Sequence, residues 1–353
     1  MRFRDEHPWP SSQQQLKGGS RDRTLDIAPA NRRPHRLYRI TMGKSFNPAQ
    51  DIGSLEGKVI LVTGGNVGLG KQTIAYLSAH NPTRIYLAAR TESKARDAIA
   101  SIKSSVPNAC EITYLPIDLS SFSSIAEAAA TFKAQESRLD ILINNAGIIA
   151  TSYSTTKEGY EIQFGTNHMG HALLTKLLLP TLLETAKQPG SDVRIVNLSS
   201  LGHYYPVSKG IEFDQAALAH ESYSRCYGSS KLANLLFARS LAEQYPQITS
   251  VSLHPGIIIT DLFKHVQSNV FMKLGFWIYG LIGLFLPGHY KSPERGGALN
   301  TTWCATTAKA ELENGAYYMP VGKKSGGSRW ARDEGLKKKL WEWTEEELLK
   351  YGY

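Results

Sequence analysis

Six short runs of apolar residues recur between residues 59 and 253, and polar or glycine-rich segments bound each of them. The runs are Val59–Val62, Ile85–Ala89, Ile112–Ile117, Ile141–Ile143, Ile195–Leu198 and Val251–Leu253. Segments of helical composition lie between them, for example near Leu69–His80 and over residues 92–105. Strands that alternate with helices at this spacing predict a parallel sheet buried on both faces. We therefore predict a single α/β domain, a doubly wound parallel sheet of about seven strands with helices on both faces.

A glycine-rich segment follows the first run and opens the first predicted helix. It reads Thr63-Gly64-Gly65-Asn66-Val67-Gly68-Leu69-Gly70, and we call Gly64–Gly70 the glycine turn. Glycines permit a tight turn and a close approach of the backbone to a pyrophosphate, and a helix N-terminus offers free N–H groups. Strand, turn and helix together predict dinucleotide binding, although the spacing G-x-x-x-G-x-G differs from the common G-x-G-x-x-G.

The second run ends in Ala88-Ala89-Arg90. Folds that bind NAD usually place a carboxylate at the end of this strand, where it holds the ribose 2′-hydroxyl. Alanine occupies that place here, and the guanidinium that follows suits a 2′-phosphate. The sequence therefore favours NADP(H). Lys71, directly after the glycine turn, either helps to bind the phosphate or is a solvated helix charge.

Polar residues also end the third and fourth runs. Asp118 follows Ile117 and either contacts the ligand or caps the next helix with its side chain. Asn144-Asn145-Ala146-Gly147 ends the fourth run and is either part of the site or an ordinary Asn/Gly turn. Ligands of a doubly wound sheet bind beyond the carboxyl ends of the strands. All of these motifs are therefore expected at one edge of the sheet.

Tyr227 and Lys231 lie four residues apart in Tyr227-Gly228-Ser229-Ser230-Lys231. In a helix they share one face, a turn apart. The unperturbed pKa of a phenol is about 10, and a nearby ammonium favours the phenolate and lowers that pKa toward a range useful for proton transfer. Alone, such a pair is more often a coincidence on an amphipathic helix.

Taken in order, these motifs resemble the short-chain dehydrogenase/reductase family over about residues 57–260, with extended similarity to near 320. The matching elements are Thr63-Gly64-x-x-x-Gly68-x-Gly70, Asp118, Asn144-Asn145-Ala146-Gly147, Asn167, Ser199-Ser200, Tyr227-x-x-x-Lys231 and Pro255-Gly256. Residues 165–171 and His254-Pro255-Gly256 resemble the retinol dehydrogenase-like and WW-domain oxidoreductase-like branch. The resemblance implies a Rossmann-type domain, which we place over residues 51–330.

The resemblance also implies catalytic roles. Tyr227 would be the general acid in carbonyl reduction and the base in alcohol oxidation. Ser200 would hydrogen-bond the substrate oxygen, and it is assigned over Ser199 by the motif alone. Lys231 would bind the nicotinamide ribose and lower the pKa of Tyr227. Asn167 would hold a water that joins Lys231 to a proton relay.

An NADP(H) site is implied as well. Its residues would be Gly64, Asn66, Gly68, Leu69, Gly70, Arg90, Asp118, Asn145, Ala146, Tyr227, Lys231, Pro255, Gly256 and Thr260. The glycines would form the phosphate turn, Asp118 would meet the adenine and Asn145 would pack beside the adenosine ribose. Residues Pro255–Thr260 would border the nicotinamide.

Two segments bear on the substrate. Tyr227 follows Ser200 by 27 residues, a longer gap than in many family members. This insertion contains His203, Tyr204 and Tyr205, which we expect to form one wall of the substrate pocket. The resemblance places a lid near residues 261–292, and its aromatic and aliphatic side chains predict an apolar substrate.

Residues 270–286 raise the question of a membrane. The uncharged stretch Leu274–Leu286 has 13 residues, fewer than the roughly 20 that span a bilayer. We favour a lid or a subunit contact, as in a homodimer, over a contact with a membrane surface. We expect a cytoplasmic protein, with peripheral attachment to an intracellular membrane as the alternative.

The composition excludes some functions. The net charge is +9, but residues 1–41 hold nine Lys/Arg and four acidic residues, so the remaining chain carries only +4 and nucleic-acid binding is not favoured. Residues 1–50 are predicted to be a disordered basic extension. The three cysteines lack C-x-x-C spacing, which indicates a reducing compartment and no metal site. Residues 331–353 predict a helical tail with Thr344 as N-cap and tryptophans that pack.

These observations predict an NADP(H)-dependent oxidoreductase that interconverts a carbonyl and an alcohol on an apolar small molecule, with reduction as the favoured direction. One alternative is a nucleotide-sugar epimerase or dehydratase on the same fold, although the G-x-x-G-x-x-G turn and larger C-terminal domain of such enzymes are not seen. The other is a non-catalytic NADP(H)-binding regulator, which has no need of Ser200, Tyr227 and Lys231 together.

Overall fold

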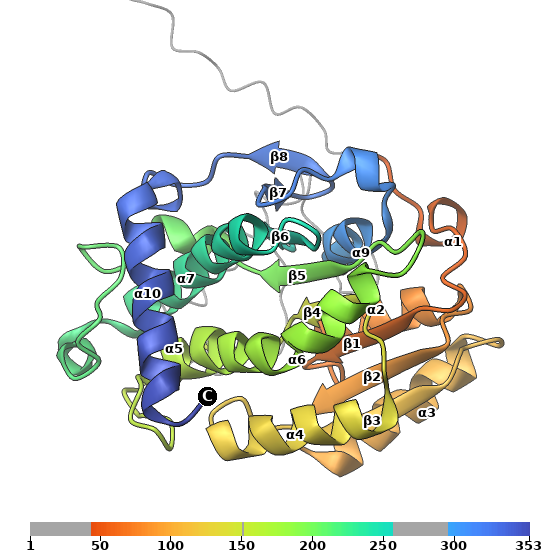
Figure 1. Cartoon of the computed structure of the whole chain (residues 1–353), viewed down its shortest axis with the longest axis horizontal. Helices are drawn as coiled ribbons and strands as arrows, with labels where there is room; N and C mark the ends of the chain where they lie inside the picture. The colour runs from red at the N-terminus through yellow and green to blue at the C-terminus, as the bar shows by residue number, and fades with distance from the viewer. Residues whose placement is uncertain (1–43, 150–151, 257–295) are drawn as a thin grey trace, which may run out of the picture. The chain divides into compact units, whose positions relative to one another are not determined.

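A computed structural model describes residues 44–149, 152–256 and 296–353 (Figure 1). Within these ranges the strands form one eight-stranded sheet in the order β3-β2-β1-β4-β5-β6-β7-β8. They are β1 (Val59–Thr63), β2 (Arg84–Ala89), β3 (Ile112–Pro116), β4 (Ile141–Asn144), β5 (Arg194–Leu198), β6 (Thr249–Leu253), β7 (Tyr317–Met319) and β8 (Lys323–Ser325). All neighbours are parallel except β7 and β8. The predicted doubly wound sheet is confirmed, and β8 adds a short polar edge strand.

Helices cover both faces of the sheet (Figure 1). The α-helices are α1 (Pro48–Asp51), α2 (Gly68–Ser78), α3 (Glu92–Ser105), α4 (Phe122–Gln135), α5 (Ile162–Phe164), α6 (Gly170–Ala186), α7 (Tyr223–Gln244), α9 (Leu299–Thr306) and α10 (Glu334–Lys350). The turns of other helix types are η1 (Gly165–Met169), η2 (Leu201–Tyr204), η3 (Ala217–His220), η6 (Lys309–Glu311) and η7 (Trp330–Arg332). Residues of α4, α6, α7 and α10 share one buried core, and those of α2, α3 and α9 share the other.

Successive residues of β1 alternate between these two cores. Val59 and Leu61 belong to the core under α4, α6 and α7, whereas Ile60 and Val62 belong to the core under α2, α3 and α9. The alternation arises because successive side chains of a strand point to opposite faces of the sheet. Since both faces are covered, the strand reads as a continuous apolar run.

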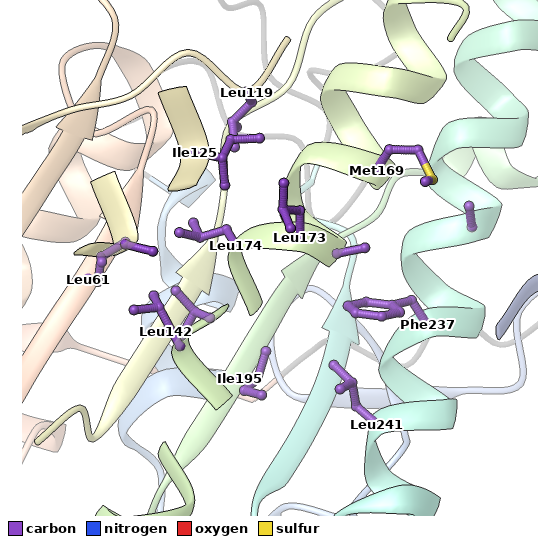
Figure 2. Close-up of a cluster of buried hydrophobic side chains, with 14 of the residues drawn as sticks. Leu61, Leu119, Ile125, Leu142, Met169, Leu173, Leu174, Ile195, Phe237 and Leu241 are labelled. Carbon is purple, nitrogen blue, oxygen red and sulfur yellow. The ribbon is translucent and has the colours of Figure 1, made fainter. Parts of the chain in front are cut away.

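Aliphatic side chains from three central strands meet the helices on the α6 and α7 side (Figure 2). Leu61, Leu142 and Ile195 lie in one cluster with Leu173 of α6 and Phe237 of α7. Full burial of such a side chain contributes roughly 1.5–3 kcal/mol. This packing holds α7, which carries the Tyr227 motif, in a fixed position on the sheet.

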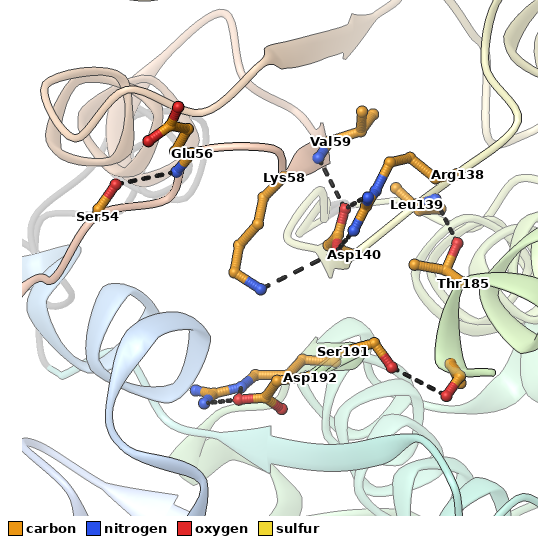
Figure 3. A network of polar contacts seen from close by, with 12 residues as sticks. Ser54, Glu56, Lys58, Val59, Arg138, Leu139, Asp140, Thr185, Ser191 and Asp192 are labelled. Carbon is orange, nitrogen blue, oxygen red and sulfur yellow. Dashed lines mark hydrogen bonds and ion pairs between the residues drawn. The ribbon is translucent and has the colours of Figure 1, made fainter. Parts of the chain in front are cut away.

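A buried carboxylate ties the amino ends of β1 and β4 together (Figure 3). Asp140 accepts the N–H of Val59 at 2.9 Å and forms a bidentate pair with Arg138 at 2.9 and 2.6 Å. Lys58 adds an ion pair at 4.0 Å. A buried charge is tolerated only with such partners. This network lies at the opposite edge of the sheet from the sequence motifs, so its role is structural.

The prediction that residues 1–50 are disordered is wrong at its C-terminal end. Residues 44–50 are folded: α1 begins at Pro48, and the side chain of Asn47 caps it by accepting the N–H of Ala49. The N–H of Lys44 donates to the carbonyl of Val321. Asparagine followed by proline is a helix-start signal that the disorder prediction overlooked. The rest of the predicted extension, residues 1–43, lies outside the described residues.

The C-terminal helix starts earlier than predicted and packs into the domain core. Asp333 is its N-cap. Thr344, predicted as the N-cap, lies inside the helix, is buried, and has its hydroxyl 3.1 Å from Nε2 of His168. The prediction was wrong because Leu336, Leu340 and Trp343 form one apolar face at helical spacing, which packs on the core and continues the helix through Thr344. The packing role of the tryptophans is confirmed, since Trp341 and Trp343 pack on the α6 and α7 core.

Candidate active site

The glycine turn connects β1 to α2, and two of its glycines are required by the available space. Gly64 has φ +66°, and a Cβ there would lie 3.0 Å from Cα of Ala146. A Cβ at Gly70 would lie 2.4 Å from the carbonyl oxygen of Gly64. α2 begins at Gly68, and Val67 before it supplies no side-chain cap. The first N–H groups of α2 are therefore left for a ligand.

Asn145 fastens the glycine turn to the end of β4. Its side-chain amide donates to the carbonyl oxygens of Thr63 at 2.7 Å and Gly64 at 3.4 Å. Its amide oxygen is buried without a hydrogen-bond partner among the described residues. Buried acceptors normally have a partner. A ribose hydroxyl group could donate to this acceptor beside the glycine turn, so the residues present fit a dinucleotide.

A cavity of about 670 Å³ opens beside the glycine turn at the carboxyl ends of β1 to β4. It brings together many of the predicted cofactor residues, namely Gly64, Asn66, Gly68, Leu69, Gly70, Arg90, Asp118, Asn145 and Ala146. Gly147 and Ile148 continue the lining toward α7. Its volume lies within the usual range for small-molecule sites.

Two basic side chains flank this cavity where β2 ends. Arg90 and Lys94 line it, both are exposed, and neither has an ionic or hydrogen-bond partner in the described part of the chain. Lys94 was missed by the sequence analysis, although it lies only four residues after Arg90. Lys71 donates to Oγ of Ser101 at 2.8 Å and does not line the cavity. For Lys71 the structure supports the reading as a helix surface charge.

Asp118 lines the cavity but does not cap α4. Its carboxylate accepts the N–H and the hydroxyl of Ser120 at 2.9 and 2.7 Å. The N-cap of α4 is Ser121, whose hydroxyl accepts the N–H of Ser124. Asp118 instead closes a short turn on its own backbone, a common role of aspartate before a helix.

Ser200, Tyr227 and Lys231 meet where β5 ends and α7 begins. The hydroxyl of Ser200 accepts the N–H of Gly202 at 3.1 Å. It lies beside the ring of Tyr227, because a Cβ at Gly202 would be 3.0 Å from Cε1 of Tyr227 and 3.6 Å from Oγ of Ser200. The buried ammonium of Lys231 lies 5.7 Å from the ring centroid of Tyr227 and donates to the carbonyl of Leu198 at 3.2 Å. Tyr227 and Lys231 lie in the first turns of α7, so the predicted helical pair is present.

The geometry separates the two neighbouring serines. Ser199 is buried, and its hydroxyl donates to the backbone carbonyl of Lys231 at 2.7 Å. Ser200 is partly exposed and contacts Tyr227. Of the two, Ser200 is the serine whose hydroxyl is free to reach a substrate.

Burial shifts both members of the Tyr227–Lys231 pair toward their neutral forms. It raises the pKa of Tyr227 to about 12, and the hydrogen bond from Ser200 offsets part of this. It lowers the pKa of Lys231 to about 8. The expected lowering of the Tyr227 pKa by Lys231 is therefore not seen: burial raises this pKa more than the interaction with Ser200 lowers it.

Asn167 lies in the π-helical turn η1, and such turns are rare and frequent at functional sites. Its side-chain oxygen accepts the N–H of Ile148 at 2.8 Å, and its amide donates to Oγ of Ser230 at 3.0 Å. A Cβ at Gly147 would lie 3.1 Å from Nζ of Lys231 and 3.4 Å from Oδ1 of Asn167. Both side chains thus approach Gly147, which lines the cavity.

Comparison with known proteins gives the family. A family model described as short chain dehydrogenase matches residues 58–270. The chain belongs to the short-chain dehydrogenase family. The short-chain dehydrogenase/reductase drtF of Aspergillus calidoustus is 36% identical over 310 residues, which cover 84% of this chain and 95% of that protein.

Two further similarities refine this assignment. Retinol dehydrogenase 11 of Homo sapiens is 36% identical over 295 residues, 82% of this chain and 85% of that protein. The retinol dehydrogenase-like branch inferred from residues 165–171 is confirmed by such relatives. Among solved structures, an uncharacterized protein from Mycobacterium paratuberculosis has a TM-score of 0.64 and 27% identity, with 86% of this chain and 97% of that chain covered.

The short-chain dehydrogenase motif after β6 is only partly described. Pro255 and Gly256 follow the strand, and Gly256 has φ +107°, which suits glycine. Thr260, the predicted lid near residues 261–292 and the stretch 270–286 lie outside the described residues. Within the ranges that are described, no helix is long and apolar enough to cross a membrane, and no three His, Cys, Asp or Glu side chains could hold a metal ion together.

The insertion after Ser200 divides into two parts. Tyr204 and Tyr205 line a second cleft of about 620 Å³, and Tyr205 is 76% exposed. His203 is buried, with Nδ1 2.6 Å from the carbonyl oxygen of Ser200 and Nε2 accepting the N–H of Ser328 at 3.1 Å. The two tyrosines line this cleft, and a wall of the substrate pocket stays a prediction for them. The histidine is not exposed and instead fixes the backbone of Ser200. Its partner Ser328 is too distant in sequence to be foreseen.

Proposed function

We propose that this short-chain dehydrogenase is an NADP(H)-dependent oxidoreductase that interconverts a carbonyl and an alcohol on an apolar small molecule. The observation that carries the proposal is the contact of Ser200 with Tyr227 beside the buried Lys231. Negative charge grows on the carbonyl oxygen during hydride transfer, so two adjacent hydroxyl groups suit its stabilisation in the transition state.

Tyr227 acts as the general acid. A nicotinamide cofactor, when bound, supplies the hydride. A pKa of about 12 keeps the phenol protonated at neutral pH, so Tyr227 has a proton to give to the substrate oxygen. Ser200 donates a hydrogen bond to the same oxygen.

Lys231 binds the nicotinamide ribose and stabilises the phenolate that Tyr227 becomes. An ammonium has three donors, and one hydrogen bond, to the carbonyl of Leu198, is found within the described chain. The remaining donors are available to ribose hydroxyl groups. The side chain of Asn167 supports this arrangement, because it and the ammonium of Lys231 both approach Gly147.

The charges at the end of β2 favour NADP(H) over NAD(H). Arg90 and Lys94 present two cations to the cavity beside Ala89, at the place where NAD-binding folds use a carboxylate. A 2′-phosphate can pair with both cations. On the substrate side, Tyr204 and Tyr205 supply exposed aromatic surface in the second cleft, which Gly202 also lines, and this supports an apolar substrate. A homodimer and a peripheral membrane contact stay predictions.

A screen with the purified protein tests this function. Aldehydes, ketones and alcohols are incubated with NADPH or NADP⁺ while the absorbance of the reduced cofactor is followed. We expect NADPH to be consumed with apolar aldehydes or ketones, and faster than NADH. Cofactor binding without turnover of any compound would support the regulator instead. Conversion of a nucleotide sugar without net change in NADPH would support the epimerase.

A further inference from the structure

A continuous chain of buried hydrogen bonds joins the glycine turn to α7. The hydroxyl of Thr63, the last residue of β1, lies 2.8 Å from Nε2 of His171, and Nδ1 of His171 lies 2.9 Å from the carbonyl oxygen of Asn167. The side-chain amide of Asn167 donates to Ser230 at 3.0 Å, and the hydroxyl of Ser230 donates to the carbonyl of Tyr227 at 2.8 Å. The four side chains are at most 2% exposed, so water does not compete for these bonds.

Each hydrogen bond of this chain has a defined donor and a defined acceptor. A carbonyl oxygen only accepts, so Nδ1 of His171 carries the hydrogen and Nε2 keeps a lone pair. Thr63 donates to that lone pair, because its own lone pairs accept the N–H groups of Asn145 and Ala146 at 2.9 and 3.0 Å. The carbonyl oxygen of Ile143 in β4 is the other acceptor near the hydroxyl of Thr63, and it lies farther away, at 3.4 Å. The ring is neutral, since burial and the nearby Lys231 lower the pKa of His171 to about 4.

We propose that His171 is a positioning residue that holds Asn167 and the first turns of α7 in register with the glycine turn. Among the described residues that line the cavity, His171 does not appear. It acts through the backbone of Asn167, whose side chain approaches the same glycine as Lys231. A buried network of this kind is fully satisfied and therefore rigid. Occupation of the glycine turn and placement of Tyr227 are energetically coupled through it.

Matched variants distinguish this coupling from a general loss of folding stability. Thr63→Val removes the hydroxyl and keeps the shape, whereas Thr63→Ser keeps the hydroxyl. His171→Phe removes both ring bonds, and His171→Asn retains a donor close to the carbonyl of Asn167. His168 supplies the control, because it lies in the π-helical turn η1 next to Asn167, is 1% exposed, and bonds Thr344 of α10 instead.

The first measurement is the affinity for NADPH by fluorescence titration, which needs no turnover. We expect Thr63→Val and His171→Phe each to weaken the binding of NADPH by about three- to tenfold. The double variant is expected to bind NADPH no more weakly than the single variant with the lower affinity, because both substitutions break the same chain of hydrogen bonds. Thr63→Ser is expected to recover most of the affinity. Multiplying effects in the double variant, or wild-type affinity in His171→Phe, would overturn the proposal. His168→Phe is expected to lower Tm without changing the affinity.

The second measurement rests on the proposed function and uses kcat for reduction of an apolar aldehyde at saturating NADPH. We expect His171→Phe to lower kcat by more than about tenfold while KM for the aldehyde changes less than about threefold. His171→Asn should restore part of kcat. A merely structural histidine would lower Tm, as is expected for His168→Phe, and would leave kcat at the wild-type value. If the wild-type protein converts no aldehyde, ketone or alcohol, the proposed function fails, and the affinity measurements still decide the coupling.

Discussion

Gly202 lies directly against the ring of Tyr227. A Cβ at position 202 would be 3.0 Å from Cε1 of Tyr227 and 3.6 Å from Oγ of Ser200. Gly202 carries no functional group, yet its lack of a side chain allows the loop after β5 to approach the phenol. The spacing of Ser200 and Tyr227 therefore depends on this glycine.

Gly202→Ala is expected to displace the phenol from Ser200 and to lower kcat for aldehyde reduction by about tenfold or more, because small misplacements of reacting groups are costly. Gly53→Ala is the matched control, since a Cβ there meets no atom within 4 Å. Steady-state kinetics of both variants check this. Equal kcat values in the two variants would show that the ring can move aside without consequence.

Tyr227→Phe removes the proton donor and keeps the ring. We expect kcat to fall by about 10²–10⁴-fold, the usual contribution of a general acid. NADPH affinity should change little, because the phenol is only one of many groups at the site. Kinetics and fluorescence titration on the same preparation measure both quantities. Unchanged turnover would show that Tyr227 is not the general acid.

Lys231→Met is expected to stabilise the protein while abolishing activity. Burial lowers the pKa of this ammonium from 10.5 to about 8, which corresponds to a cost of roughly 3 kcal/mol at neutral pH. Methionine fills similar space without a charge, and such replacements of buried charges are often stabilising. Urea denaturation at pH 7 should give a higher free energy of unfolding for the variant. A less stable variant would contradict the assignment of this cost.

The same lysine predicts a pH dependence of stability. Below about pH 8 the amine is protonated in both the folded and the unfolded chain, so the cost of burying the charge is constant. Between about 8 and 10.5 only the unfolded chain binds the proton, so the cost falls as the pH rises. The stability advantage of Lys231→Met over wild type should shrink across this window in denaturation experiments at several pH values. An advantage that grew with pH would have the wrong sign.

Arg90→Asp tests the cofactor preference. It replaces the cation directly after Ala89, the place where NAD-binding folds use a carboxylate, by an anion that repels a 2′-phosphate, so NADPH affinity should fall by at least about tenfold while NADH affinity is kept or improved. Lys71→Asp makes the same change of charge on α2, but Lys71 bonds Ser101 away from the cavity. Titration with both cofactors distinguishes the variants. Equal losses for NADPH and NADH in Arg90→Asp would argue against a 2′-phosphate site.

The sheet and the motifs at its strand ends could be predicted because both are local patterns. β1 is recognisable as an apolar run since both of its faces are buried. The glycine turn is recognisable because Gly64 and Gly70 occupy positions that admit no side chain. Tyr227 and Lys231 are recognisable because a helix brings residues four apart together.

Contacts between distant segments could not be predicted. The Thr63–His171 bond spans 108 residues and the His168–Thr344 bond 176. Thr344 has the local features of an N-cap, yet the packing of α10 on the core places it inside the helix. The pKa of Tyr227 was also misjudged, because it depends on burial by several elements and not only on the lysine one turn away.

The glycine turn and the end of β2 tolerate change to very different degrees. A side chain at Gly64 or Gly70 would meet neighbouring atoms at 3.0 Å or less, whereas Arg90 and Lys94 are exposed on the surface. Substitutions at the first pair would disturb the fold, and substitutions at the second would change only the charge offered to a ligand. On the proposed function, the dinucleotide preference of this scaffold can therefore be switched at Arg90 and Lys94 without rebuilding the glycine turn.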